Sequence, residues 1–207
     1  VDELAPHIGQ RVLEVGAGLG AVTRELLARG RDVTALEPDP SLHARLVGGA
    51  NGATLVNGTL DDVPLGSTFD TVLYVNVLEH IRDDADELRA AGSFLAPGGN
   101  IVVFVPALPS LYGTMDEVSG HHRRYRRAEL SAVFAAAGLR TTAIRSFDPV
   151  GVVPYWAMYR VLRRTALGGA SVGLYDRVII PLSRAVSLLT RGHGPGKNLV
   201  AVGSPLV

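Results

Sequence analysis

The chain contains no cysteine among its 207 residues. Without thiols it can form no disulfide, hold no zinc through cysteine and use no thiolate nucleophile. No charged and then apolar leader precedes Leu4, so we expect no signal peptide and a cytoplasmic location. The apolar run 150–159 ends at Arg160 after ten residues, whereas a membrane-spanning helix needs about 20. We therefore expect this run not to span a membrane.

The composition is that of a folded protein, with 47% hydrophobic and 19% charged residues. The charges are unevenly distributed. Residues 1–120 carry 7 arginines and 17 acids (7 − 17 = −10), and residues 121–207 carry 13 basic residues and 3 acids (13 − 3 = +10). Such asymmetry indicates either an anionic partner or two faces of one domain that neutralise each other.

Short β-rich runs alternate with helical stretches, which predicts a doubly wound α/β sheet. Residues 107–126 are expected to form a loop. The strands are predicted over 12–15, 33–36, 54–56, 71–75, 101–105, 140–147 and 199–202. The helices are predicted over 21–29, 42–47, 83–95, 127–137, 150–164 and 174–189.

The first strand runs into the glycine-rich stretch VLEVGAGLG, which admits two interpretations. The glycines at 16, 18 and 20 fit a dinucleotide loop, and they also fit a nucleotide loop with an acid built into the strand. Glu14 favours the second interpretation, because a buried carboxylate is costly unless it has a partner. The ammonium of an amino-acid-bearing nucleotide is a natural partner. Glu37 ends the second strand, where a carboxylate can bind ribose hydroxyls in either case.

Polar residues also follow the fourth strand. Asn76, Glu79 and His80 come directly after the buried run 71–75. Ligands of open α/β sheets bind beyond the carboxyl ends of the strands, so these side chains are expected at the site. A Leu-x-Pro-Gly-Gly turn begins fifteen residues later, at Leu95. Oxidoreductases that use NAD do not usually combine these features.

Together these motifs resemble the class I S-adenosylmethionine-dependent methyltransferases. They are Glu14–Gly20, Glu37, Asn76–His80 and the turn and strand from Leu95. The stretch GHHRRYRRAEL from Gly120 is similar to a bacterial subgroup that methylates small molecules. The resemblance implies a Rossmann-like, doubly wound, seven-stranded sheet with a helical insertion between the last two strands. It also implies one domain over 1–207, with a cofactor-binding core at 1–106 and substrate or lid elements at 107–126 and 148–190.

The resemblance implies that the cofactor is S-adenosylmethionine, with S-adenosylhomocysteine as product. The glycines would line its methionine part, Glu14 would lie near its amino group and Glu37 would bind its ribose. Thr59 stands where the family often has an adenine-binding acid, so Leu60 and Asp61 are assigned to the adenine instead. The complete set of implied cofactor-binding residues is Glu14, Gly16, Ala17, Gly18, Gly20, Glu37, Pro38, Leu60, Asp61, Asn76 and Val77.

A base is needed where the acceptor must lose a proton. His80, His121 and His122 are the candidate catalytic residues, because the pKa of histidine suits neutral pH. The alternative is a structural role for His80, and binding of the cofactor-side loop or an anionic substrate for the other two.

Tyr112, Tyr125 and Trp156 are the candidate substrate-binding residues, with packing as the alternative. Some related quinone-pathway methyltransferases carry E-x-x-E-H with a divalent metal. Asn76 replaces the first acid here, so we expect no metal.

The predicted function is methyl transfer to oxygen, nitrogen or carbon of a small-molecule acceptor, which could be anionic. The alternative is a non-catalytic cofactor-binding protein whose basic half docks on a membrane or a partner. Nucleic acid is not expected as a substrate, because the segment from Asn76 to Glu79 after the fourth strand lacks the aromatic residue that stacks on a flipped base. The run 150–159 is expected to cover the active site or to contact a second copy in a homodimer. A helix held on a membrane surface by its arginines is the alternative.

Overall fold

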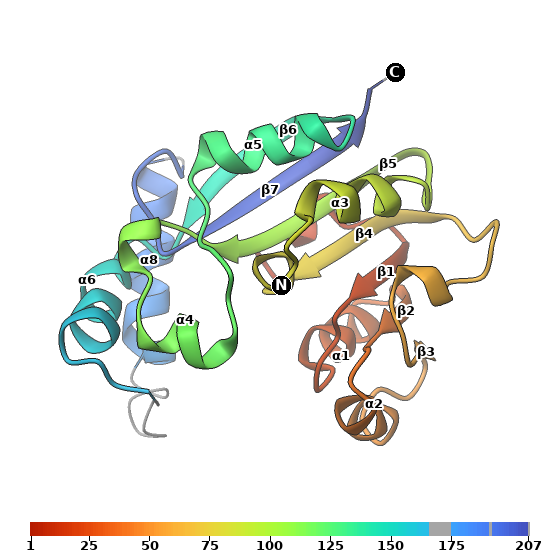
Figure 1. Ribbon diagram of the computed structural model, residues 1–207, viewed down its shortest axis with the longest axis horizontal. Coiled ribbons are helices and arrows are strands. Elements are labelled where there is room, and N and C mark those ends of the chain that lie inside the picture. Colours follow the sequence, from red (N-terminus) through yellow and green to blue (C-terminus); the bar gives the residue numbers. More distant parts are fainter. Residues whose placement is uncertain (166–174, 191, 207) are drawn as a thin grey trace.

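The fold was analysed in a computed structural model, which describes residues 1–165, 175–190 and 192–206. One seven-stranded sheet has the order β3-β2-β1-β4-β5-β7-β6 (Figure 1). The first five strands are parallel, and β7 runs antiparallel to both of its neighbours. The strands are β1 (Arg11–Val15), β2 (Asp32–Leu36), β3 (Thr54–Val56), β4 (Phe69–Val75), β5 (Leu95–Pro106), β6 (Leu139–Phe147) and β7 (Asn198–Pro205).

Alternate residues of the central strands point to opposite faces of the sheet and form two cores. Leu13 and Val72 pack on the face covered by the helices α3 (Asp84–Gly92) and α5 (Arg127–Ala136). Val12 and Leu73 pack on the other face. That face is covered by the helices α1 (Ala21–Ala28) and α2 (Pro40–Val47) and by the short turn η1 (Ala5–His7). The strands are buried on both faces, as their apolar sequences predict.

The predicted strands are all present, and most differences concern their ends. The largest concerns β5, because the predicted turn 97–100 lies inside it. Its register with β4 jumps from the pair Phe69 and Leu95 to the pair Thr71 and Asn100. Gly98 has a φ of 79° in this irregular segment. The predicted helix 83–95 is shorter than expected, because Ser93 and Phe94 form a turn and Leu95 begins β5.

The prediction of a loop over 107–126 is wrong in part. This segment contains the turn η4 (Pro109–Leu111) and the helix α4 (Thr114–Ser119). Asp116 accepts the backbone N–H of Gly113 at 3.0 Å, which closes the start of α4. Gly120 ends it with a φ of 75°. The helix is too short for a periodic apolar pattern to reveal it in sequence.

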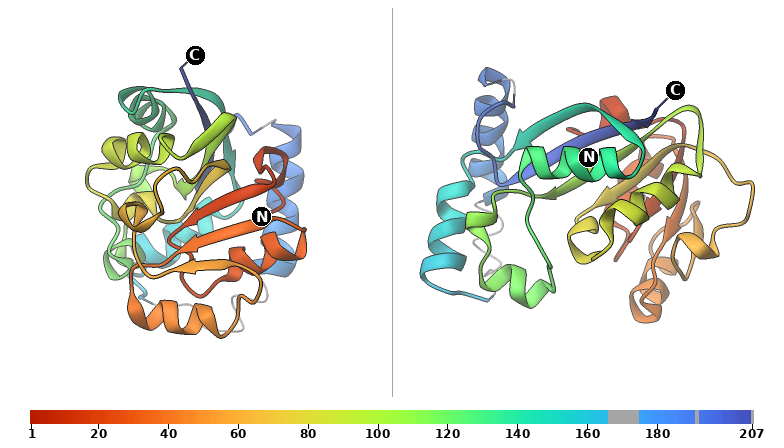
Figure 2. Two further views of the ribbon diagram at one scale, coloured as in Figure 1. Left: turned by 90° about the vertical axis from the view of Figure 1, so that its right-hand side faces the viewer. Right: turned by 45° about the horizontal axis from the view of Figure 1, so that its top comes forward.

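A helical insertion lies between β6 and β7, as predicted. Its helices stand at the end of the sheet formed by β6, far from β3 (Figure 2). The predicted helix 150–164 is α6 (Val152–Tyr155) followed by the π-helical η5 (Trp156–Val161). The second predicted helix is the π-helical η6 (Tyr175–Ile179) followed by α8 (Ile180–Leu189). The expected start of that helix at 174 and the glycine break at 168–169 lie outside the described residues.

Asp148 fixes the insertion to the sheet. Its carboxylate accepts the hydroxyl of Ser183 at 2.5 Å and the backbone N–H of Gly151 at 2.9 Å, and it pairs with Lys197 at 3.0 Å. These partners belong to α8, the start of α6 and the segment before β7. In the part of the chain that the structure describes, we find no helix with the length and hydropathy that a bilayer crossing requires.

Two further 3-10 turns complete the described elements. The turn η2 (Leu60–Asp62) precedes β4, and η3 (Leu78–His80) follows it. The η3 turn brings its residues back over the carboxyl end of β4, where the site described below lies.

Candidate cofactor and acceptor site

The glycine-rich loop after β1 needs its glycines for backbone geometry. Gly16 and Gly18 have φ values of 71° and 56°, and Gly20 has a φ of 74° at the start of α1. These are left-handed conformations that favour glycine. A Cβ on Gly16 would lie 2.6 Å from Val77, so the loops after β1 and β4 approach each other closely. A Cβ on Gly18 would meet no atom within 4 Å, which leaves its backbone open to a ligand.

The carboxylate of Glu37 holds this loop in place. One oxygen accepts the backbone N–H of Gly18 at 2.7 Å, and the other accepts that of Asp39 at 2.9 Å. The side chain is buried at the carboxyl end of β2. Asn57 donates to the Glu37 carbonyl at 2.8 Å from the end of β3. Each carboxylate oxygen keeps a lone pair that can accept a ligand hydroxyl.

Glu14 is buried in β1, directly below the loop. The hydroxyl of Thr23 in α1 donates to its carboxylate at 2.6 Å. Burial raises the pKa of Glu14 to about 7, against the hydrogen bond from Thr23, which lowers it. A carboxyl with this pKa is poised to gain a cationic partner.

The residues assigned to the adenine lie beside each other in η2, with different exposure. Leu60 is buried and Asp61 is exposed. Asp62 accepts the backbone N–H of Thr59 at 2.9 Å and so fixes the turn. Ala17 is buried at the loop, and the exposed Pro38 follows Glu37.

A cavity of about 630 Å³ opens beyond the carboxyl ends of β4 and β5, and we call it the edge cavity. Asn76 and His80 line it from the segment after β4, and Tyr155 and Ile180 line it from the insertion. Asn76 has a φ of 54°, and its backbone N–H donates to Phe104 at 2.8 Å. The remaining lining residues include Phe104, Met115, His121, Arg124, Phe147 and Lys197.

Asp116 organises the charges behind the edge cavity. Its fully buried carboxylate pairs with His121 Nδ1 and with Arg124 Nε, both at 2.8 Å. It also accepts the hydroxyl of Tyr155 at 3.3 Å. Burial raises the pKa of Asp116, but these partners outweigh it and the pKa lies below its usual value. Asp116 is therefore ionised at neutral pH and fixes the imidazole of His121.

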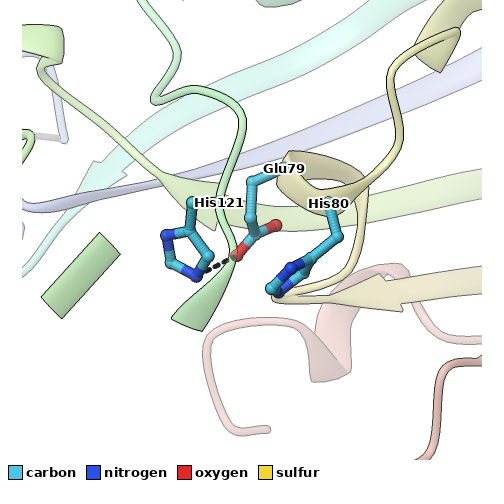
Figure 3. A group of neighbouring side chains, drawn as sticks. All are labelled: Glu79, His80 and His121. Carbon is cyan, nitrogen blue, oxygen red and sulfur yellow. Dashed lines mark ion pairs between the residues drawn. The ribbon is translucent and has the colours of Figure 1, made fainter. Parts of the chain in front are cut away.

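Glu79 lies on the other side of His121. Its side chain is 0% exposed, and neither of its oxygens has a hydrogen-bond partner among the described residues. His121 Nε2 is 3.8 Å from one oxygen (Figure 3). Burial raises the pKa of Glu79 to about 7, although the charges of His121 and Arg124 lower it. The imidazole of His121 thus lies between two buried carboxyl groups.

The structure brings together two of the three candidate catalytic histidines. The rings of His80 and His121 are 4.7 Å apart and nearly perpendicular, and both line the edge cavity. Desolvation lowers the pKa of His80, and the charge of His121 acts in the same direction. His80 is therefore neutral at neutral pH. His122 is exposed and is not among the lining residues, although its backbone N–H donates to Glu79 at 2.9 Å.

Among the described residues, one group of three side chains could hold a divalent ion. Glu79, His80 and His121 each present a ligand atom, and these atoms lie within 4.8 Å of one another. That the protein uses no metal, as expected from Asn76, stays a prediction.

None of the three aromatic residues assigned to substrate binding lines the edge cavity. The hydroxyl of Tyr112 donates to the His121 carbonyl at 2.8 Å, and that of the buried Tyr125 donates to Asp84 at 2.9 Å. Trp156 is 48% exposed. Their roles toward an acceptor stay predictions. Tyr155, which the sequence analysis missed, lines the cavity, with its ring 4.5 Å from the guanidinium of Arg124.

Comparison with known proteins agrees with this geometry. Residues 1–144 match the family described as Methyltransferase domain. The chain belongs to this family, the class I S-adenosylmethionine-dependent methyltransferases. An uncharacterized methyltransferase of Mycobacterium tuberculosis is 32% identical over 101 residues, covering 49% of this chain and 42% of the relative. A ubiquinone biosynthesis O-methyltransferase of Marinobacter nauticus is 32% identical over 111 residues, covering 50% and 47%. The chain thus spans less than half the length of these relatives.

The crystal structure of a glycopeptide N-methyltransferase, MtfA, complexed with S-adenosylmethionine superimposes on the chain with a TM-score of 0.64. The sequences are 16% identical, and the match covers 99% of this chain and 92% of the other. This likeness supports the methyltransferase fold. S-adenosylmethionine is the cofactor of the family.

The residues of this methyltransferase chain fit that cofactor. The open backbone at Gly18, the buried carboxylate of Glu37 and the buried Glu14 lie at the carboxyl ends of β1 and β2. These are the positions where an open α/β sheet binds a nucleotide. They offer a backbone that a ligand can approach closely, an acceptor for hydroxyl groups and a partner for a cation, which the adenosyl and amino-acid parts require.

Proposed function

We propose that the chain transfers a methyl group from S-adenosylmethionine to a small-molecule acceptor bound in the edge cavity. The observation that carries this proposal is the position of Asn76. It follows β4 directly, next to Val77 against the glycine loop, and it also lines the edge cavity. A cofactor held by the glycine loop would therefore adjoin an acceptor in the cavity.

The bound cofactor supplies an electrophilic methyl group on a sulfonium. The chain has to hold the acceptor nucleophile in line with it and exclude water, and such alignment accounts for several kcal/mol of a barrier. The aromatic walls Phe104, Phe147 and Tyr155 suit the body of an organic acceptor. Arg124 and Lys197 also line the cavity, and each is already paired with an aspartate. An anionic acceptor stays a prediction.

His80 is the proposed general base. It faces the cavity and its lowered pKa leaves it neutral, so a ring nitrogen can accept the proton that the acceptor O–H or N–H loses as the methyl group arrives. His121, which is oriented by Asp116, lies against the ring of His80 and keeps the two imidazoles perpendicular. Methyl transfer then yields S-adenosylhomocysteine, the methylated acceptor and a protonated His80.

The acceptor atom is proposed to be oxygen or nitrogen, because a base serves acceptors that carry an ionisable proton. Relatives and structural neighbours include an O-methyltransferase of ubiquinone biosynthesis and a glycopeptide N-methyltransferase. The division into a cofactor-binding core at 1–106 and acceptor elements at 107–126 and 148–190 is part of this proposal. The competing hypothesis is a cofactor-binding protein without turnover.

The test is S-adenosylhomocysteine formation with a panel of substituted phenols and amines, for the wild type and His80→Gln. We expect turnover that depends on the acceptor. The loss in His80→Gln should be largest for phenols of high pKa and smallest for those already ionised, since only the former need a base. His43→Gln, a change outside the cavity, serves as the matched control. Cofactor binding without turnover for any acceptor would favour the competing hypothesis.

A further inference from the structure

The helical insertion carries an apolar surface on its outer side. In η6 and α8, Val178, Leu182 and Leu189 are exposed, the last of them 86% exposed. Their spacing of four and seven residues places them on one side of a helix. A helix on the surface of a globular protein normally turns polar residues to solvent. Here the exposed stripe is apolar instead.

The neighbouring helical segment also exposes apolar side chains. Val153 and Trp156 are three residues apart in α6 and η5 and are 70% and 48% exposed. Val161 and Leu162 follow and are exposed as well. Tryptophan is the side chain that prefers the boundary between water and lipid, because its ring is apolar and its N–H is polar.

The charge of the insertion has one sign. Arg160, Arg163, Arg164, Arg177 and Arg184 lie in it, and Asp176 is the sole acid between residues 149 and 190 of the sequence. Among the described residues, no carboxylate pairs with three of these arginines, those at positions 160, 164 and 177. The insertion thus combines exposed apolar side chains with exposed arginines that pair with no carboxylate among the described residues.

The inner side of the same helices faces the edge cavity. Tyr155 and Ile180 line the cavity, one from each helical segment. The segments lie beyond the end of β6, the edge strand of the sheet (Figure 2). No helix among the described residues is long and apolar enough to cross a membrane.

We propose that the outer side of α6, η5, η6 and α8 docks on an anionic lipid bilayer. The charge pattern favours this occupant over a second copy of the chain. An isologous dimer would place the same patch on both sides of the interface. The excess positive charge of the insertion would then lie on both sides of the interface. An anionic lipid surface neutralises that charge, and its boundary region accepts the valine, leucine and tryptophan side chains.

Docking in this orientation would place the edge cavity beside the lipid surface. A consequence, which rests on the proposed function, is that the acceptor is an amphiphile drawn from the bilayer. The docking proposal itself does not depend on turnover.

The test is co-sedimentation of the chain with vesicles of phosphatidylcholine alone and of phosphatidylcholine mixed with phosphatidylglycerol, without cofactor or acceptor. We expect binding to the mixed vesicles that weakens as salt is raised. Arg160→Gln combined with Arg164→Gln should lower the partition coefficient roughly 30-fold, since each cation near an anionic surface contributes about fivefold. Trp156→Ser combined with Leu189→Ser should lower it at least about tenfold.

Matched controls make the same chemical changes elsewhere. Arg45→Gln combined with Arg140→Gln removes two exposed cations outside the insertion, and Leu65→Ser removes an exposed leucine on a loop. These controls should keep the wild-type partition coefficient, and all variants should keep cofactor binding, which shows that they fold. Equal binding of wild type and insertion variants would overturn the proposal. So would self-association that Leu189→Ser abolishes while vesicles bind nothing, which would assign the patch to a second copy.

Discussion

Each side of the site contains a buried glutamate with a raised pKa, and these two glutamates are held differently. On the cofactor side, Glu14 receives a hydrogen bond from Thr23 at 2.6 Å. On the acceptor side, Glu79 has no hydrogen-bond partner among the described residues. Burial raises the pKa of both to about 7. Equal pKa values therefore arise in two different environments.

The difference lies in what surrounds each carboxyl group. The cofactor side is built from backbone geometry, with glycines in left-handed conformations and Glu37 bound to two backbone N–H groups. The acceptor side is built from side-chain charges, with Asp116 bound to His121 and Arg124. On the cofactor side, the buried groups gain their remaining partners only when a ligand binds. On the acceptor side, the charged side chains already satisfy one another, so removing one of them destabilises the folded chain. The experiments below test this contrast.

The largest effect is expected for Asp116→Asn. The substitution keeps the shape but leaves the buried guanidinium of Arg124 without a counter-charge. Breaking a buried ion pair by removing one partner costs about 3–5 kcal/mol of unfolding free energy. Urea denaturation measures this loss.

Asp86→Asn is the control for that experiment, because it removes a carboxylate whose ion pair with Arg89 is exposed. Exposed pairs contribute about 0–1 kcal/mol. Similar losses in the two variants would mean that Asp116 does not organise a buried network.

A smaller effect on the free energy of unfolding is expected for Glu79→Gln. At high pH this variant should be more stable than the wild type. The folded pKa of about 7 lies above the ordinary 4.5, so the wild type loses stability as pH rises from the lower value through the higher one. The loss amounts to about 3 kcal/mol for this group. The glutamine variant should lack it. Urea unfolding at about pH 5 and about pH 8 measures the change in each protein.

The free energy of unfolding should therefore fall further for the wild type than for Glu79→Gln between these two pH values. Glu14 contributes the same kind of loss to both proteins and cancels in the difference. Parallel stability profiles for the two proteins would show that Glu79 is not buried as an isolated carboxyl group.

The same contrast explains what could be predicted from sequence. The seven strands, the glycine loop and Glu37 follow from patterns of neighbouring residues, and each lies where expected. Asp116 was missed because α4 is short and its segment was expected to be a loop. Its partners Arg124 and Tyr155 come from separate segments, so only the folded chain brings them together. Tyr155 was missed as a cavity residue because no periodic pattern fixed which side of α6 faces inward.

Lys197 illustrates the same limit over a longer range. It is the single lysine of the chain and lies just before the last strand. It reaches Asp148 at 3.0 Å, at the other end of the insertion. Contacts that close such a long insertion depend on topology, and residue patterns along the chain do not reveal them.

Glu37→Ala probes the cofactor side directly. The variant loses the acceptor proposed for the ribose hydroxyls and the carboxylate that holds Gly18. Hydrogen bonds to a charged group contribute about 1.5–3 kcal/mol, so the affinity for S-adenosylmethionine and S-adenosylhomocysteine should fall roughly 10- to 100-fold. Calorimetric titration measures it, with NAD as a ligand that should not bind. Unchanged affinity, or binding of NAD in place of the adenosyl ligands, would remove Glu37 from the cofactor site.

The smallest effect is expected for Glu14→Gln, and it concerns pH dependence. The amino group of the cofactor pairs best with an ionised carboxylate, so affinity should rise with pH up to about 7, the pKa of Glu14, and then level off. Below that pH the wild type should lose about tenfold per pH unit, while the glutamine variant should show a flat profile. Thr23→Val sharpens the test. This variant loses the hydrogen bond that lowers the pKa of Glu14. Its curve of affinity against pH should therefore lie at higher pH than that of the wild type. A wild-type profile as flat as that of Glu14→Gln would place the amino group elsewhere.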